Sequence, residues 1–520
     1  MEQFTGCFSE RVSWSVVDGV AVWGWPFRDG DVVSGRSLAA CFRDVDTVDG
    51  FRSVVDSLNG PFAVVVETDT SAFVAVDRWQ SLPLFYAETA DGVHVSDDPA
   101  RLRDAADDDD VDELAVAEYV RSTFVTGSRT LAPSASQLQA GELLAVTETA
   151  EGFQGRTDRY YRFADRETVD FDQPRLLDAY DRVLEDVFDR LVDYADGRPI
   201  ALSLSSGHDS RLVALELVER DSPDLYAFSY SRNQEEKSAR RIADDLDIPF
   251  SEIVITREAV ASWYDSAGRE RFDEYAGIEG RVPNYWLPVV MQKLKAETDV
   301  PDDAVVVTGD GAHGMSSAVP VEWTDRESIT RAEFLDAVFE LSYACMNVDE
   351  HLEQAVRDQA LAALEDGLYA GTDAEPADRA IPAFEEWNWQ ERQGKAITSG
   401  YVYRYYGDDC WFPLKDDAYM DFWRDAPLEH RVQKAFHKQY VERRYQEVTG
   451  VSRPAATFEV LPTWLWYLNR SVGELPVVGS AGRRIYNHLF ASDTNYKPIF
   501  GVLEEDEYRD LLGELDVEST

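Results

Sequence analysis

A short apolar run, a turn of small polar residues and an amphipathic helix follow one another directly in this chain. This succession constrains the fold more than any other feature. The run at residues 200–204 comes after Arg198 and Pro199, which is typical of a buried parallel strand. The turn Ser205–Ser210 then leads into the helical pattern of residues 211–217. Backbone N–H groups and the positive end of a helix dipole meet at such a turn, which indicates either a polyphosphate site or a capped turn without ligand.

Asp209 belongs to this turn, where a carboxylate would repel phosphate unless a cation lay between them. Mg²⁺ is usually held by one or two carboxylates together with phosphate oxygens. We therefore expect Asp209 to be a Mg²⁺ ligand if the turn binds a polyphosphate.

Alternating strands and helices continue after the turn. The sequence predicts strands at residues 225–229, 253–255 and 305–307, with helical patterns between them. Strands separated by helices predict an α/β doubly wound parallel sheet. Ligands of such sheets bind beyond the carboxyl ends of the strands, which is where Ser205 and Gly309 fall.

The length of 520 residues predicts two domains, because it exceeds what one hydrophobic core usually supports. Residues 1–165 are dominated by short strands, including an Asp-Gly hairpin at residues 15–23, and predict an α+β layered domain. Residues 175–520 would form the second domain, with its α/β core at residues 195–320. Residues 325–520 predict a helical region without a further strand.

The net charge of −49 and the isoelectric point near 4.4 are extreme for a globular chain. Because the acids are spread among apolar periodic segments, they resemble the surface of a halophilic protein that stays soluble in concentrated salt. An acidic interaction tail is the rival interpretation. The same charge disfavours nucleic-acid binding.

Targeting signals and a disulfide frame are not predicted. The four cysteines are widely scattered, and the N-terminus lacks the basic and apolar regions of a secretory signal. A run of about 20 apolar residues, which a membrane span requires, is missing. We therefore expect a cytoplasmic protein.

Three common catalytic or binding motifs are missing as well. They are the Walker A loop, the His-Glu-x-x-His metal motif and the Gly-x-Ser-x-Gly elbow.

Taken in order, several segments resemble the asparagine synthetase family. In the first half, the resemblance to the family's glutaminase-type domain, an Ntn-hydrolase-like sandwich, rests on residues 58–63, 76–86, 95–98, 118–120, 127–131, 138–142 and 160–163. In the second half, Ser205–Ser210 is similar to the SGGxDS motif of the PP-loop pyrophosphatase fold, with Ser206 in place of a glycine. Thr308–Gly314 is similar to the second ATP-site loop, and Trp411–Asp416 resembles the family's PFLD element.

The resemblance implies an adenylating reaction. ATP with Mg²⁺ activates a carboxylate and pyrophosphate is released, and an amine then displaces AMP to form an amide. The implied nucleotide-binding set is Ser205, Ser206, Gly207, Asp209, Ser210, Gly309 and Asp310. Asp209 and Asp310 would hold Mg²⁺. Lys434 or Lys438 would join Asp209 in catalysis by neutralising the leaving group, and both lysines remain candidates.

Two departures from the family pattern limit what the resemblance implies. The family's glutaminase uses an N-terminal cysteine, but aligning Gly6 with the family's glycine puts Glu2 at that position. Cys7 could replace it only after cleavage of the chain, so we expect no glutaminase activity. At the second loop, His313 stands where the family has an aspartate. Either Asp310 takes over the metal, or His313 contacts phosphate as a cation, or metal binding is impaired.

Three functions remain open on the sequence. The first is an asparagine synthase-like, AMP-forming amide ligase that uses ammonia or another amine, with a small-molecule carboxylate and an amine as partners. The second is a catalytically degenerate relative that binds nucleotide or a partner. The third is a sugar-modifying amidotransferase subunit supplied with ammonia by another protein. Neither nucleic acid nor a membrane is an expected partner, and a homodimer is left open.

Overall fold

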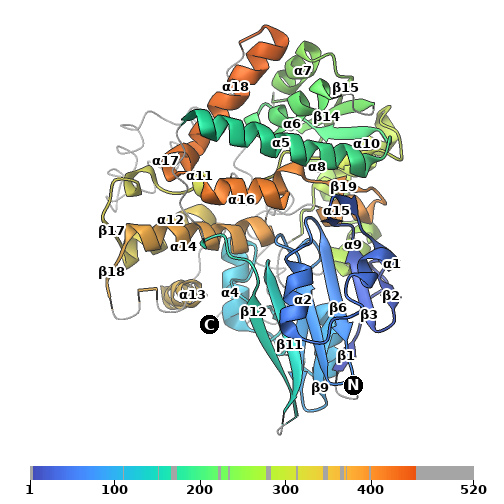
Figure 1. The fold of residues 1–520 in the computed structure, drawn as a ribbon, viewed down its shortest axis with the longest axis vertical. Coiled ribbons are helices and arrows are strands. Elements are labelled where there is room, and N and C mark those ends of the chain that lie inside the picture. Colours follow the sequence, from blue (N-terminus) through green and yellow to red (C-terminus); the bar gives the residue numbers. More distant parts are fainter. Residues whose placement is uncertain are drawn as a thin grey trace.

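The protein forms two parts that lie against each other (Figure 1). The structure, a computed structural model, describes residues 4–108, 110–149, 152–165, 173–220, 224–231, 235–276, 283–311, 314–343, 350–363, 368–369, 372–396 and 400–452. We call residues 4–165 the N-terminal sandwich, the remainder the C-terminal part, and the contact between them the seam.

The N-terminal sandwich contains two sheets. The six-stranded sheet is antiparallel throughout, in the order β12-β11-β7-β6-β3-β2. Its strands are β2 (Ser15–Val17), β3 (Val20–Gly24), β6 (Phe62–Glu67), β7 (Ser71–Val76), β11 (Glu142–Thr149) and β12 (Gly152–Arg159). The four-stranded sheet has the order β1-β9-β8-β10 and consists of β1 (Phe4–Gly6), β8 (Phe85–Thr89), β9 (Gly92–Ser96) and β10 (Ser136–Gln137). A small hairpin joins β4 (Phe27–Arg28) to β5 (Asp31–Val32).

Alternating side chains explain the layers of the sandwich. On β6, Ala63 and Val65 pack in the core between the sheets, whereas Val64 and Val66 pack under two helices on the outer face. A third helix packs Leu102 against β8 on the opposite side. The helices are α1 (Gly35–Ala40), α2 (Val48–Val55), α3 (Pro99–Ala106) and α4 (Glu113–Ser122). This layered α+β arrangement agrees with the sequence, while its likeness to Ntn hydrolases in particular stays a prediction.

The C-terminal part is built on a five-stranded parallel sheet in the order β15-β14-β13-β16-β19. Its strands are β13 (Ile200–Ser203), β14 (Leu225–Ser231), β15 (Phe250–Val254), β16 (Val305–Val307) and β19 (Cys410–Trp411). Its surrounding helices include α5 (Gln173–Ala195), α6 (His208–Glu219), α7 (Glu235–Asp245), α8 (Arg257–Tyr264), α9 (Ala267–Ala276) and α10 (Leu287–Glu297). The predicted parallel sheet is therefore present, and its strand order reverses between β13 and β16.

The expectation that no strand follows residue 325 is wrong. β17 (Ser328–Thr330) pairs with β18 (Ala374–Pro376), and β19 extends the parallel sheet beside β16. These strands have only two or three residues, too few to show a periodic pattern. The strand predicted at residues 253–255 also lies earlier, as β15.

Helices dominate the remaining described chain. They are α11 (Gly314–Ser317), η1 (Val321–Trp323), α12 (Arg331–Ser342), α13 (Glu350–Ala362), α14 (Ala377–Trp387), the π-helix η2 (Asn388–Ala396), α15 (Gly400–Tyr405), η3 (Pro413–Lys415), α16 (Asp417–Asp425), α17 (Leu428–Arg431), η4 (Val432–Lys434) and α18 (Ala435–Thr449). The predicted helical region continues to residue 520, but residues 453–520 lie outside the described part. Among the described helices, none combines the length and the apolar character that crossing a bilayer requires.

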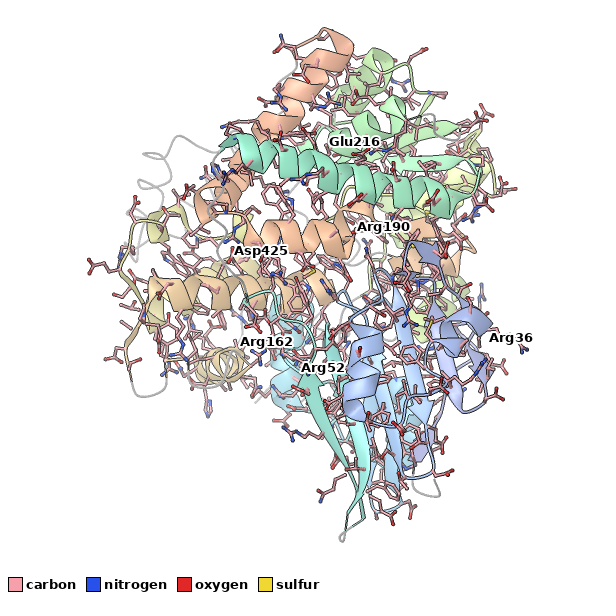
Figure 2. The ribbon with its side chains drawn as sticks, viewed as in Figure 1. Arg36, Arg52, Arg162, Arg190, Glu216 and Asp425 are labelled. Carbon is pink, nitrogen blue, oxygen red and sulfur yellow. The ribbon has the colours of Figure 1, made fainter. Side chains whose placement is uncertain are left out.

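The seam joins the two parts through a shared core and through polar contacts. Trp79 of the sandwich lies in the same hydrophobic cluster as residues of α5 and the parallel sheet. Asn59 donates to Asp416 at 3.2 Å and accepts from the backbone N–H of Asp417 at 3.0 Å. Arg190 extends from α5 (Figure 2) and binds both carboxylate oxygens of Asp416, at 2.7 and 2.8 Å. The start of α16 is therefore held from two sides.

Candidate functional site

The reversal of strand order between β13 and β16 marks the point where doubly wound sheets bind their ligands. The turn Ser205–Ser210 follows β13, and Gly309 follows β16. A Cβ atom on Gly309 would lie 2.6 Å from the backbone nitrogen of Ser210 and 2.8 Å from the carbonyl carbon of Asp209. Because a side chain cannot fit there, glycine is what allows the two loops to touch.

The loop after β16 also touches the segment that follows β19. A Cβ atom on Gly311 would collide with the side chain and backbone of Leu414. The three segments that resemble family motifs in the second half, Ser205–Ser210, Thr308–Gly314 and Trp411–Asp416, therefore meet in one place. The positions of these segments in the sequence did not predict that they contact one another.

The turn after β13 is held together by its own hydroxyl groups. The hydroxyls of Ser205 and Ser210 lie 2.9 Å apart, and the backbone N–H of Ser205 donates to the Ser210 hydroxyl at 3.0 Å. The N–H of Gly207 donates to the Ser205 hydroxyl at 3.1 Å. Ser206 and Gly207 are half-buried and Ser205 is exposed. The turn is thus shaped by hydrogen bonds among its own residues, at the start of the twelve-residue helix α6.

Asp209 lies beside Lys434, one of the two lysines that the resemblance left open. Lys434 Nζ is 2.7 Å from Asp209 Oδ2. The backbone of Gln433 and Lys434 has positive φ angles of 54° and 57°, a conformation that costs roughly 1 kcal/mol per non-glycine residue. This turn between η4 and α18 brings Lys434 to Asp209. Lys438, one helical turn further, makes no ion pair within the described part of the chain.

Asp310, the second predicted Mg²⁺ ligand, shares the electrostatic surroundings of Asp209. Burial raises the pKa of Asp310, and the charge of Asp209 raises it further, whereas Lys415, Lys434 and a hydrogen bond from Thr308 lower it. That hydrogen bond runs from the Thr308 hydroxyl to Asp310 Oδ2 at 3.2 Å.

The donor set of this site fits Mg²⁺. Two carboxylates on touching loops are what this ion needs from a protein when phosphate oxygens supply further ligands. No group of three or more acids, histidines or cysteines that could hold a metal occurs among the described residues.

Two histidines of the site were missed by the sequence. His208 Nε2 lies 3.1 Å from Glu442 Oε1 of α18, and burial lowers the pKa of His208 while Glu442 partly offsets this. His437 is fully buried, with Nε2 3.0 Å from Asp209 Oδ1 and Nδ1 3.0 Å from the Tyr180 hydroxyl. The residues concerned come from α5, α6 and α18, so spacing along the chain could not reveal them. His313 lies outside the described residues, and its contribution stays a prediction.

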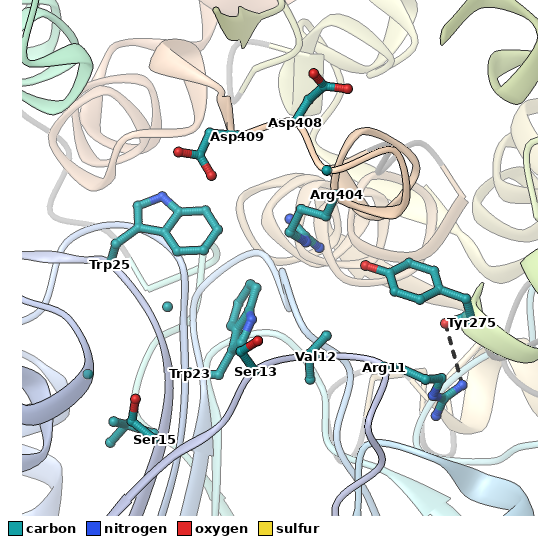
Figure 3. A pocket seen from close by; sticks show the side chains of 14 residues that line it. Arg11, Val12, Ser13, Ser15, Trp23, Trp25, Tyr275, Arg404, Asp408 and Asp409 are labelled. Atoms are coloured by element: carbon teal, nitrogen blue, oxygen red, sulfur yellow. Dashed lines mark hydrogen bonds between the residues drawn. The ribbon is translucent and has the colours of Figure 1, made fainter. Parts of the chain in front are cut away.

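A cavity of about 340 Å³ lies elsewhere, at the seam (Figure 3). Three of its charged lining residues are in ion pairs: Asp408 is 2.7 Å from Lys295, Asp409 is 2.5 Å from Arg198, and Arg11 is 3.3 Å from Asp98. We place the candidate site at the strand reversal, where the contacts between motifs converge, and not in this cavity.

The thiol of Cys7, near the start of the N-terminal sandwich, is half-buried. Cys7 follows β1, and its carbonyl oxygen accepts from the Ser96 hydroxyl at 2.5 Å. Burial raises the pKa of the Cys7 thiol, although Arg101 acts against this. A raised pKa lowers the fraction of the nucleophilic thiolate. Glu2 lies outside the described residues.

Residues 47–161 match the glutamine amidotransferase domain family. The match covers less than half of the chain and begins after β5 and α1. A comparison with curated proteins finds no match.

Among solved structures, the chain is similar to the glutamine phosphoribosylpyrophosphate amidotransferase from B. subtilis in complex with ADP and GMP, at 13% identity and a TM-score of 0.18. The similarity covers 59% of this chain and only 59% of that one. The NH₃-dependent NAD synthetase from Campylobacter jejuni subsp. jejuni NCTC 11168 matches at 15% identity and a TM-score of 0.21, over 37% of this chain and 83% of that chain. The NAD⁺ synthetase from Burkholderia pseudomallei matches at 18% identity and a TM-score of 0.20, over 46% and 92%. We draw nothing about fold or function from TM-scores this low. The chain thus contains a region similar to an amidotransferase domain, and the asparagine synthetase resemblance of its second half stays a prediction.

Proposed function

We propose that this protein is an asparagine synthase-like ligase that uses ATP and Mg²⁺ to activate a small carboxylate and joins it to ammonia or another amine. One observation carries the proposal. Three segments that are far apart in sequence meet at the strand reversal, and there Asp209 lies 2.7 Å from Lys434. A carboxylate, a cation and a turn of small residues are the groups that a polyphosphate-binding site requires.

In this proposal the chain's own groups mainly bind and orient. The turn Ser205–Ser210 holds the pyrophosphate portion of the nucleotide at the start of α6, where the helix dipole favours negative charge. Asp209 and Asp310 hold Mg²⁺, which when bound neutralises the charge that develops on the phosphates. Lys434 supplies a second positive charge for the leaving pyrophosphate.

The proposed enzyme lacks glutaminase activity of its own. Class II glutaminases need a terminal cysteine whose thiol attacks and whose amine acts as base. In this chain Cys7 is internal, and burial raises the pKa of its thiol. Ammonia or an amine substrate would therefore come from solution or from another protein.

The decisive assay measures pyrophosphate and AMP released from ATP, with Mg²⁺ and high salt, across a panel of carboxylates and amines. We expect release with at least one pair, and we expect Asp209→Ala to reduce the rate at least about 100-fold. Asp189→Ala removes an exposed acid from α5 and serves as the matched control, with an expected change below about twofold. A nucleotide that binds without any turnover would indicate the catalytically degenerate relative instead, and turnover only with a sugar acceptor would indicate the amidotransferase subunit.

A further inference from the structure

One side of the π-helix η2 holds the N-terminal sandwich. The side chains of Trp389, Gln390 and Lys395 donate to carbonyl oxygens of the sandwich, Trp389 at 2.9 Å, Gln390 at 3.0 Å and Lys395 at 2.6 and 2.8 Å. Lys395 Nζ also lies 2.7 Å from Glu391 Oε2, and Glu391 Oε1 accepts from the N–H of Gly127 at 3.1 Å. The polar groups on this side of η2 therefore support the seam.

The opposite side of η2 contacts the second loop of the candidate site. Asn388 Nδ2 donates to the carbonyl oxygen of Gly314 at 3.5 Å. A Cβ atom on Gly314 would lie 3.4 Å from Gln393 Nε2. The hydrogen bonds of a π-helix join residues five positions apart, so residues four and five positions apart lie on one face. Arg392 follows Asn388 by four positions and therefore lies on the face of η2 that contacts this loop.

Arg392 carries a guanidinium without a partner in the part of the chain that the structure describes. It is half-buried, and with the described residues it makes neither a hydrogen bond nor an ion pair. Burial lowers the pKa of Arg392, and no carboxylate offsets this effect. Elsewhere burial also lowers the pKa of arginines, but neighbouring carboxylates outweigh it, as at Arg78, Arg190, Arg198, Arg424 and Arg444.

The composition makes this lack of a partner informative. The chain has 99 acidic residues against 50 lysines and arginines, so a half-buried arginine would be expected to find a carboxylate. Leaving a buried polar group unsatisfied costs free energy unless water or a ligand binds it. The N–H donors of Arg392 are therefore available to an anion from outside the chain.

The second loop runs from the proposed nucleotide site to the helix that carries Arg392. Gly309, near its start, touches the turn Ser205–Ser210, and Gly314, at its end, touches η2. The helix α11 begins at Gly314 and packs against both η2 and η4, and η4 ends at Lys434. Lys434 and Arg392 thus belong to two neighbours of one short helix. Lys434 pairs with Asp209, whereas Arg392 stays available.

We propose that Arg392 is a specificity-determining residue that binds a second anionic group, a carboxylate or a phosphate, on the small carboxylate substrate. This inference rests on the proposed function, because that function supplies the substrate. The planar fork of a guanidinium binds two oxygens of such a group at once. The reacting carboxylate would lie at the nucleotide, and the second group would lie at the far end of the loop, beside η2.

An arginine without an acid partner suits this task in an acidic chain. The net charge of −49 repels a dianion from the protein as a whole, so the attraction must be local. A paired arginine would have to give up its carboxylate before it binds a substrate, whereas Arg392 exchanges only water. Because Arg392 is half-buried, salt screens its attraction less than that of a surface charge.

The test measures binding of three probes of similar length to the full chain by calorimetry: butanoate, succinate and 3-phosphonopropanoate. Mg²⁺ and a non-hydrolysable ATP analogue are present, and the salt concentration is constant. We expect succinate or 3-phosphonopropanoate to bind about 10-fold or more tightly than butanoate. The preferred probe shows whether the second group is a carboxylate or a phosphate.

The variants show whether this preference comes from Arg392. Arg392→Met should remove it, while the affinities for butanoate and for the ATP analogue change less than about twofold. Arg392→Lys keeps the charge without the fork and should recover part of the preference. Arg379→Met is the matched control, because Arg379 lies on the preceding helix α14, is exposed and pairs with Glu375 at 3.0 Å.

The outcomes separate this inference from the proposed function. If wild type binds the ATP analogue but neither dianion more tightly than butanoate, or if Arg392→Met keeps the preference, the inference is wrong while the nucleotide site stands. If Arg392→Met weakens binding of the ATP analogue as much as binding of the dianions, Arg392 contacts the nucleotide and the inference is overturned. If wild type binds a dianion through Arg392 but no nucleotide, the proposed function fails and the anion site stands.

Discussion

The two places where the family resemblance implies chemistry, the strand reversal of the C-terminal part and the first strand of the N-terminal sandwich, differ in what their residues can do. At the strand reversal, Asp209 contacts Lys434 and His437, and Gly309 lets two loops touch. At the first strand, Cys7 is an internal residue, and burial raises the pKa of its thiol. We therefore expect the C-terminal part to carry the activity, although the resemblance covers both halves.

The largest effect is expected where the contact between the loops is closest. Gly309→Ala puts a Cβ atom 2.6 Å from the backbone nitrogen of Ser210, and backbone cannot move aside as a flexible side chain could. We expect loss of nucleotide binding and of pyrophosphate release, because a displacement near 1 Å can cost about 100-fold. Calorimetry and the release assay measure this.

The control for Gly309→Ala is Gly197→Ala. Gly197 has a φ angle of 77° and open space around its Cβ position, so alanine there costs only about 1 kcal/mol of stability. If the two variants bind nucleotide with equal affinity, the contact between the loops is not what forms the site.

We expect a somewhat smaller effect when Lys434 is replaced, and almost none when Lys438 is replaced. Lys434→Met removes the cation beside Asp209 and should lower the rate of pyrophosphate release about 100-fold. Lys438→Met, one helical turn further, should stay within about twofold of wild type. Michaelis–Menten kinetics of both variants provide the comparison, and a larger loss in Lys438→Met would reverse our assignment.

The sequence predicted the mixed α/β layers of the fold, whereas the site residues it named stay predictions. Apolar runs such as residues 200–204 and 305–307 identified strands of the parallel sheet, because buried strands have a clear composition. β19 escaped prediction because two residues cannot show a pattern. His437 escaped because the residues it contacts, Asp209 and Tyr180, lie on other helices. Sequence periodicity predicts individual helices and strands, but only the structure shows which distant elements contact each other.

We expect the free energy of unfolding to depend on pH through a carboxyl group at the seam. Burial raises the pKa of Asp417 to about 8, although Arg78 at 3.3 Å lowers it. In the unfolded chain this carboxyl titrates near 4, so between about pH 4 and 8 the folded protein binds a proton that the unfolded chain has released. The free energy of unfolding therefore falls as the pH rises through this range.

Asp417→Asn removes this contribution, so the difference in stability between pH 5 and pH 8 should shrink by about 3 to 4 kcal/mol in urea titrations. Asp421→Asn is the matched control, since Asp421 also contacts Arg78, at 3.1 Å, but is 37% exposed. An unchanged slope in Asp417→Asn, or the same change in both variants, would contradict this account.

The smallest expected effect is at the first strand. Cys7→Ala should leave both pyrophosphate release and the absence of ammonia release from glutamine unchanged, because a thiol with a raised pKa is a poor nucleophile and Cys7 is not terminal. Coupled ammonia detection on wild type and variant measures it, with Cys41→Ala as a second half-buried cysteine for comparison. Ammonia release that disappears only in Cys7→Ala would show that the N-terminal sandwich is active after all. In that case cleavage of the chain before Cys7 would decide whether the N-terminal sandwich is active, and the residues of the sandwich would not.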